Sequence, residues 1–190
     1  MQFSLFGAEA AEPVIEDLDG LLLAGGDWVR TEKGSAARLS VLVADRWRAD
    51  ALGVELRERG LDFDVAAAPG ALLAVRTEIT EQLVAHAARW TVGASLRVPA
   101  GLALTASGLR LWALATGRVE DNGYLLGTAE PDGPVHRAGG GQLARLGVAA
   151  VDVGVRARPG WRVTSAKRLR RLAELIGQPP SGAGRNWPAG

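Results

Sequence analysis

Ala68-Pro69-Gly70-Ala71 joins two apolar runs, and its Pro-Gly pair recurs 90 residues later in Arg158-Pro159-Gly160-Trp161. In both places the pair lies between runs of β-forming residues. Proline fixes φ at the first central position of a tight turn, and glycine supplies a positive φ at the second. Each copy therefore predicts a β-hairpin, and the recurrence at nearly half the chain length predicts an internal duplication.

The elements that flank the two turns recur in the same order. An apolar helix rich in small residues opens each copy, at 18–26 and at 109–117. A short strand, a longer strand, an amphipathic helix, the hairpin and a last helix follow. The longer strand, the amphipathic helix and the last helix are expected at 38–44, 45–60 and 80–90, and again at 124–129, 131–147 and 165–176. The predicted fold is α+β, a tandem αββαββα unit with a pseudo-twofold axis and a saddle-shaped antiparallel sheet surface.

This duplication divides the chain into four segments. Residues 1–15 are expected to form a flexible N-terminal peptide, 16–98 the first repeat, 99–177 the second repeat and 178–190 a disordered tail rich in Pro, Gly and Ser. With 190 residues, 47% of them hydrophobic, the chain can bury a full core, and a monomer is expected. The sequence contains no run of 18 apolar residues, so no membrane span is predicted. The absence of cysteine fits a reducing cytoplasm, and no motif indicates a cofactor.

The first opening helix, Leu18-Asp-Gly-Leu-Leu-Leu-Ala-Gly-Gly26, resembles the nonapeptide of the LAGLIDADG homing endonucleases. Leu109–Gly117 is a weaker copy, and the resemblance extends over residues 16–177. It implies that the two opening helices pack against each other across the pseudo-twofold axis. Small residues one turn apart permit that close approach. They are Gly20 and Ala24 in the first helix, and Ala113 and Gly117 in the second.

The same resemblance implies a loss of catalysis. The family's metal-binding acids lie near the ends of the opening helices, where this chain has Gly25 and Thr116. Neither residue supplies the carboxylate that Mg²⁺ requires, so we expect no catalytic residues and no metal site. WhiA-type actinobacterial regulators are similar in having lost the acids, and the use of 20 Arg against 2 Lys fits a high-GC, actinobacterial source. The alternative is a metal-dependent endonuclease that uses the displaced Asp27.

The net charge of +1 conceals an uneven distribution, with −6 over residues 1–27 and +6 over residues 150–190. Strand alternation predicts that Val151 and Val153 point toward the helices, and that Asp152 and Arg162 point to the open face. In the family that face lies on DNA, and phosphate binding requires cations gathered on one surface. Trp28 and Trp161 are candidates for contacts with DNA. The candidate DNA-binding residues are Arg30, Arg38, Arg76, Arg118, Arg156, Arg158 and Arg162.

Residues 2–6, Gln-Phe-Ser-Leu-Phe, resemble the pentapeptide Gln-x-Ser/Asp-Leu-Phe of bacterial proteins that bind the sliding clamp. The resemblance implies that Leu5 and Phe6 enter an apolar pocket while the Gln2 amide reads polar groups, with Ser4 completing the match. The alternative is that these apolar residues pack on the core.

Together these features predict a cytoplasmic, nucleoid-associated, non-catalytic module of replication, repair or transcription. Its expected partners are DNA and the sliding clamp, with no membrane. A further alternative is a protein-interaction scaffold that binds no nucleic acid.

Overall fold

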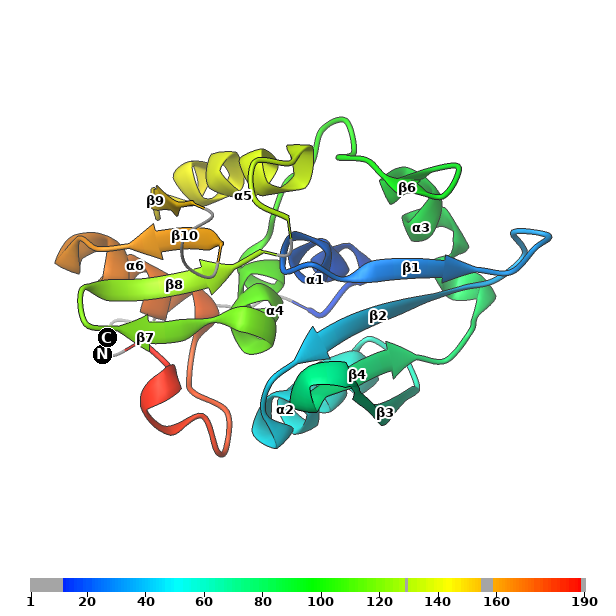
Figure 1. Cartoon of the computed structure of the whole chain (residues 1–190), viewed down its shortest axis with the longest axis horizontal. Helices are drawn as coiled ribbons and strands as arrows, with labels where there is room; N and C mark the ends of the chain where they lie inside the picture. Colours follow the sequence, from blue (N-terminus) through cyan, green and yellow to red (C-terminus); the bar gives the residue numbers. More distant parts are fainter. Residues whose placement is uncertain (1–11, 129, 155–158, 189–190) are drawn as a thin grey trace.

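The computed structural model describes residues 12–128, 130–154 and 159–188. Within these ranges, two four-stranded antiparallel sheets lie on either side of two central helices, α1 and α4 (Figure 1). The first repeat contains α1 (Asp19–Leu23), β1 (Asp27–Arg30), β2 (Ala37–Val43), α2 (Arg46–Glu58), β3 (Phe63–Ala68), β4 (Leu72–Thr77) and α3 (Val84–Trp90). The second contains α4 (Ala106–Thr116), β7 (Arg118–Glu120), β8 (Gly123–Gly127), α5 (Pro134–Arg145), β9 (Val151–Val153), β10 (Gly160–Val163) and α6 (Ala166–Ile176). A short hairpin of β5 (Thr91–Val92) and β6 (Ser95–Leu96) lies between the repeats in sequence.

The two sheets have the same strand order. The first runs β1-β2-β4-β3 and the second β7-β8-β10-β9, so each strand of one repeat has a counterpart in the other. The predicted α+β fold with a duplicated αββαββα unit is confirmed. Among the described residues, no helix is long and apolar enough to cross a bilayer.

The two Pro-Gly pairs differ in structure. Pro69 and Gly70 lie in the turn between β3 and β4, and Gly70 has the positive φ of 75° that the hairpin prediction requires. Gly160 instead begins β10, opposite Gly127 of β8, and its φ is not positive. A side chain at Gly160 would meet the Leu126 carbonyl oxygen at 2.4 Å. The second glycine therefore serves close packing between strands, and its assignment to the turn was wrong.

The central helices meet at Gly20 and Gly108. A Cβ atom built on Gly20 of α1 would lie 1.8 Å from the Gly108 carbonyl oxygen of α4, so only glycine permits this approach. Gly117 has another role, because a Cβ there would lie 2.1 Å from the Tyr124 hydroxyl. Helix α1 is also shorter than expected, since a 3-10 turn over Ile15–Leu18 precedes it. The helix seam is thus confirmed at Gly20, and Gly117 packs on Tyr124 instead.

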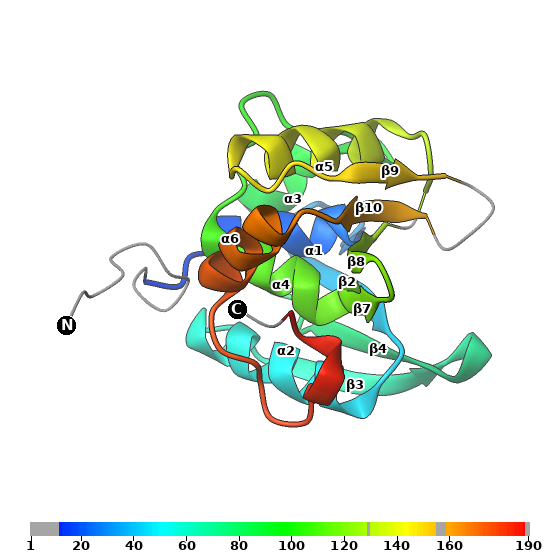
Figure 2. The same cartoon turned by 90° about the vertical axis from the view of Figure 1, so that its left-hand side faces the viewer.

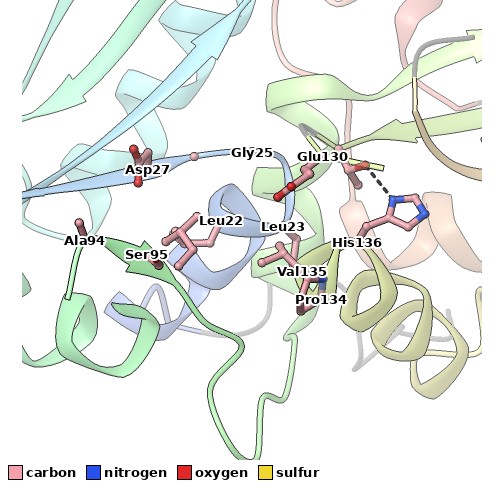
Figure 3. Close-up of a pocket in the computed structure, with 13 residues that line it drawn as sticks. Leu22, Leu23, Gly25, Asp27, Ala94, Ser95, Glu130, Pro134, Val135 and His136 are labelled. Atoms are coloured by element: carbon pink, nitrogen blue, oxygen red, sulfur yellow. Dashed lines mark hydrogen bonds between the residues drawn. The ribbon is translucent and has the colours of Figure 1, made fainter. Parts of the chain in front are cut away.

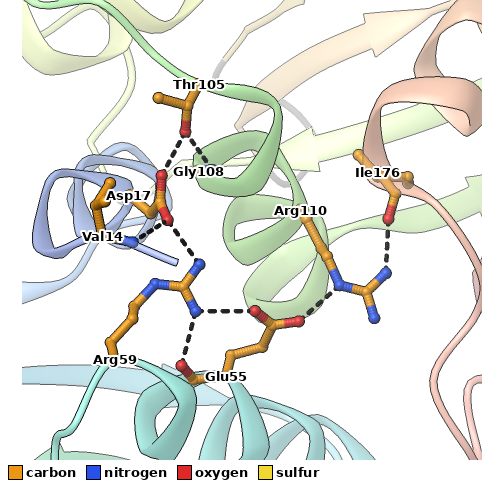
Figure 4. Close-up of polar contacts among 8 residues, drawn as sticks. All are labelled: Val14, Asp17, Glu55, Arg59, Thr105, Gly108, Arg110 and Ile176. Atoms are coloured by element: carbon orange, nitrogen blue, oxygen red, sulfur yellow. Dashed lines mark hydrogen bonds and ion pairs between the residues drawn. The ribbon is translucent and has the colours of Figure 1, made fainter. Parts of the chain in front are cut away.

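A buried chain of charged side chains joins the repeats beside this seam (Figure 4). Asp17 accepts a hydrogen bond from Thr105 Oγ1 at 2.7 Å and one from Arg59 Nη2 at 2.8 Å. Arg59 also donates to Glu55, and Glu55 accepts from Arg110 Nε of α4 at 2.6 Å. A buried ion pair is stabilising when its remaining lone pairs and protons are also satisfied. Here both carboxylate oxygens of Asp17 and of Glu55 have donors, and among the described residues Arg59 Nε is left without a partner. The network thus links α2 of the first repeat to α4 of the second.

Residues 178–188 differ from the expected disordered tail. Trp187 is buried, its Nε1 donates to the Gly177 carbonyl at 2.9 Å, and Arg110 lies over its ring at 5.4 Å. Ala183 is buried as well. The composition suggested disorder, but one buried tryptophan provides enough apolar area to hold the segment on the fold.

Candidate nucleic-acid interface

Each sheet has one face packed on helices and one open face. In the first sheet, strand register places Asp27, Ser40, Arg76 and Asp64 in one row across the open face. Arg38 and Leu42 alternate with buried residues of β2 and share that face. Arg30 pairs with Ala37, whose side chain is buried, and its Nη1 donates to Thr91 Oγ1 at 3.5 Å on the helix side. The structure therefore gathers Arg38 and Arg76 on the open face and separates Arg30 from them.

The open face of the first sheet has one compensated arginine and one without a described partner. Arg76 Nη2 lies 2.5 Å from Asp64 Oδ2 on the neighbouring strand. Among the described residues, Arg38 Nε is a buried atom with no hydrogen-bond partner. Among these residues, no carboxylate of the neighbouring strands forms an ion pair with Arg38.

In the second sheet, Arg118 and Arg162 lie on either side of Leu125 in register, on the open face. Glu120 pairs with both, at 2.9 Å from Arg118 Nη2 and 2.6 Å from Arg162 Nη2. Burial by itself raises the pKa of Glu120, but hydrogen bonds from the two guanidinium groups outweigh it and hold that pKa below its usual value. The structure brings the two arginines together, and one carboxylate compensates them in the free protein.

The predicted orientation of β9 was wrong by one residue. Val151 pairs with Arg162 on the open face, and Asp152 pairs with Trp161 on the helix side. There, His136 Nε2 of α5 lies 3.0 Å from Asp152 Oδ1, and its Nδ1 lies 2.9 Å from Thr128 Oγ1. Because side chains alternate along a strand, a shift of one residue reverses every one of them. The buried His136 therefore holds Asp152 away from the open face.

Neither strand tryptophan faces outward as a base-stacking residue. Trp161 stacks on His136, with ring centroids 4.8 Å apart, and its Nε1 donates to the His136 carbonyl at 3.0 Å. Trp28 is buried edge-on against His86, with ring centroids 5.7 Å apart. Both rings belong to the core, so the suggestion that they contact DNA was wrong.

A guanidinium group caps the end of α4. Arg48 of α2 donates from Nη1 to the Leu114 carbonyl at 2.8 Å and from Nη2 to the Gly117 carbonyl at 2.5 Å. Its side chain is only 6% exposed, and its Nε contacts Asp45 Oδ2 at 3.1 Å. Carbonyls in the last turn of a helix have no intrahelical donor and carry partial negative charge. Arg48 satisfies these carbonyls beside Thr116, one of the two positions that the family resemblance assigns to metal-binding acids.

Two pockets lie beside the ends of the central helices. One, of about 460 Å³, is lined by Asp27 of β1 and by Glu130 and His136 of the second repeat (Figure 3). The other, of about 520 Å³, is lined by the ion pair of Arg48 with Asp45, by Thr116 and by Arg118. Among the described residues, no three His, Cys, Asp or Glu side chains gather as a metal site requires. Gly25 and Thr116 hold no carboxylate, and Asp45, the carboxylate that lines the second pocket, is paired with Arg48, so the residues at the helix ends do not fit Mg²⁺.

The remaining candidate residues lie outside the described ranges. They are Arg156 and Arg158 of the DNA-binding set, and Gln2, Ser4, Leu5 and Phe6 of the clamp-binding set.

Comparisons with known proteins identify the fold. The sequence matches no family model and no curated protein. The structure is similar to the homing endonuclease I-WcaI bound to its DNA recognition sequence, with a TM-score of 0.58 and 9% identity over 85% of this chain and 79% of that one. It is similar to the N-terminal LAGLIDADG domain of DUF199/WhiA, with a TM-score of 0.58 and 16% identity over 88% of this chain and 84% of that one.

Full-length DUF199/WhiA from Thermatoga maritima gives a TM-score of 0.62 and 16% identity over 94% of this chain. This chain spans 58% of that protein's length. The chain therefore has the duplicated LAGLIDADG fold.

Proposed function

We propose that this protein is a non-cleaving, DNA-associated module whose open sheet faces lie on duplex DNA. The fold likeness to an endonuclease that was solved on its DNA recognition sequence supports the choice of partner. Arg38, Arg118 and Arg162 are the described cations best placed to contact phosphates. Arg76, and Arg156 and Arg158 in the adjoining segment, extend the proposed contact. The expected setting is the cytoplasm, at the nucleoid.

The observation that carries the non-cleaving part of this proposal is the position of Arg48. Two-metal cleavage needs carboxylates that converge at the ends of the two central helices. At the end of α4 the buried guanidinium of Arg48 is bonded to helix carbonyls, and the neighbouring carboxylate, Asp45, is already paired with it. Like charges at short range repel strongly where water is excluded, so this cation opposes divalent metal binding at Thr116. A phosphodiester would meet positive charge there without a metal-bound nucleophile.

A specific observation favours a second function, a protein-interaction scaffold. Val29 and Leu42 are 47% and 50% exposed on the open face of the first sheet, where Asp64 compensates Arg76. Exposed apolar residues on a surface are more typical of contacts with proteins than of contacts with phosphates. On this reading the first sheet binds a protein and the second sheet contributes little.

Fluorescence anisotropy with a labelled duplex separates the two functions. The wild type is compared with a saddle variant, Arg38→Gln/Arg118→Gln/Arg162→Gln, over a range of salt concentrations. Each lost phosphate contact should reduce the slope of log K against log salt by about 0.9. Arg46→Gln/Arg57→Gln/Arg137→Gln, which neutralises exposed arginines outside the open face, is the control. An affinity that is equal in the saddle variant and in the control would reject the open sheet faces as the DNA site. No binding of the wild type at low salt would reject the DNA function.

We further propose that residues 2–6 bind the bacterial sliding clamp. The support is the match of Gln2, Ser4, Leu5 and Phe6 to the clamp-binding pentapeptide. Short docking peptides lose ordering entropy on binding, so a micromolar dissociation constant, about −8 kcal/mol, is expected. Isothermal titration of the clamp with the full chain measures it directly. Together the two contacts would place a DNA-bound module at sites of replication or repair.

A further inference from the structure

The strongest uncompensated charge on the described surface lies on α6, away from the open sheet faces. Leu169, Leu172 and Ile176 recur at the spacing of one helix face and pack inward. The opposite face carries four cations and one acid, which are Lys167, Arg168, Arg170, Arg171 and Glu174. These residues, with Ser165 and Gly147, line a shallow hollow of about 650 Å³ beside the end of α5.

The cations of α6 differ from those of the open face in their pairing. On the open face, four arginines share the surface with Asp27, Asp64 and Glu120, and three of the arginines are ion-paired. On α6, Arg171 contacts Glu174 at 3.5 Å. In the described part of the chain, no ion pair involves Lys167, Arg168 or Arg170, and all three are exposed. Counterions hold these charges in solution, and a polyanion would release those counterions on binding.

We propose that this face of α6 binds the phosphate backbone of a second nucleic-acid segment, so that the protein bridges two duplexes. The inference rests on the proposed function, because it takes the open face as the site for the first duplex. Figure 2 shows α6 on one side of α4 and strands β8 and β10 on the other. One duplex cannot lie on both surfaces without a sharp bend. Two segments can be held at once.

The composition of the α6 face favours a phosphate partner over an acidic protein or a membrane. Its exposed positions from Lys167 to Glu174 include no aromatic or large apolar residue. Protein interfaces concentrate their binding energy in such anchors, so an acidic protein would find only a polar rim here. An amphipathic helix binds a membrane by inserting its apolar face. That face of α6 is already buried, through Leu172, Leu175 and Ile176, and it packs on α4.

The test measures whether the full chain brings together two separate duplexes that carry different fluorophores. The α6 variant is Lys167→Gln/Arg168→Gln/Arg170→Gln, compared with the saddle variant and with the control Arg46→Gln/Arg57→Gln/Arg137→Gln. Wild type and control should bring the two duplexes together. The α6 variant should lose pairing of the two duplexes at least tenfold while still binding a single duplex. The slope of log K against log salt for capture of the second duplex should fall by about 2 to 3. Unchanged melting temperatures establish that each variant is folded.

The outcomes distinguish this inference from the proposed function. Pairing that is equal in the α6 variant and the wild type would overturn the inference, because dimerisation or the open face would then account for it. Binding of one duplex without any pairing in the wild type would also overturn it and leave the proposed function intact. If the saddle variant binds as the wild type does and the α6 variant loses all binding, α6 is a nucleic-acid site and the open-face proposal falls. Stronger binding to anionic lipid vesicles than to duplex DNA, lost in the α6 variant, would replace the phosphate-backbone assignment with a lipid one.

Discussion

Arg48 of the first repeat donates a hydrogen bond to the Leu114 carbonyl of the second repeat at 2.8 Å, so one half of the molecule caps the central helix of the other. This contact bears on stability and on the proposed function. It satisfies carbonyls that lack helical partners, and it places a fixed positive charge where a cleaving relative needs a negative one.

Replacing Arg48 by methionine should reduce the free energy of unfolding by about 2–4 kcal/mol, because buried carbonyls of α4 lose their donors. Arg46→Met is the matched control. Arg46 precedes Arg48 by two residues on the same helix, but it is exposed, and its ion pair among the described residues is with Asp50. Urea denaturation of both variants measures the difference. Equal stability of the two would contradict the capping role.

Gly20→Ala should destabilise the protein by about 1–3 kcal/mol through overpacking against the Gly108 carbonyl. Gly141→Ala provides the contrast, because Gly141 lies in α5 and an added Cβ meets nothing within 4 Å. Alanine at that helical position should leave stability unchanged or raise it by about 0.5–1 kcal/mol. Thermal melts of the two variants compare the sites, and a Gly20→Ala protein as stable as wild type would exclude a close helix seam there.

Glu120 predicts a dependence of stability on pH. Its pKa is lower in the folded protein than the reference value of 4.5, so the ionised carboxylate stabilises the fold at neutral pH. That contribution is lost as the pH falls through the folded pKa, below 4.5. Glu120→Gln should therefore be less stable than wild type at pH 7, and the difference should close in acid. A constant difference between pH 7 and pH 3 would show that Glu120 acts through packing alone.

The same carboxylate should restrain DNA binding. Glu120→Gln frees Arg118 and Arg162, and a gain of about 1.4 kcal/mol would raise affinity for duplex DNA about tenfold. Asp121→Asn is the control, because it removes a charge from the adjoining exposed turn without freeing either arginine. Anisotropy at moderate salt reports both. Equal gains in the two variants would indicate a general charge effect and would remove Arg118 and Arg162 from the interface.

Leu5→Ala/Phe6→Ala should abolish clamp binding, since apolar anchors carry most of such an interface. Phe3→Ala should change it much less, because the second position of the pentapeptide varies. Titration calorimetry with the purified clamp measures both variants. If the double variant keeps its affinity, or if it loses several degrees of melting temperature while the wild type shows no clamp binding, the peptide does not dock on the clamp.

The sequence predicted the overall architecture because that architecture depends on periodicity and turn chemistry. The amphipathic spacing in α2 and the Pro69-Gly70 turn are local signals, and both are confirmed. Such features can be predicted without knowing which helices and strands come into contact.

The missed features depend on contacts between elements. Three charged residues recur at the spacing of the buried face of α2, namely Arg48, Glu55 and Arg59. Charged residues at core positions indicate buried partners, and that inference was not drawn from the sequence. Gly139 and Gly140 of α5 accommodate the rings of Trp112 and Trp161. The orientation of β9 was reversed because Asp152 has a buried partner, His136, on a helix that strand alternation does not consider.

One gel shows whether the protein binds DNA without cutting it. Supercoiled plasmid is incubated with the full chain and Mg²⁺ at low salt. Half of each sample is run as formed, and half after the protein has been removed. We expect plasmid that is retarded while the protein is bound and fully supercoiled once the protein is removed. Nicked or linear plasmid would contradict it, most sharply if Asp27→Asn abolished the product, and plasmid that is never retarded would contradict the DNA-associated role.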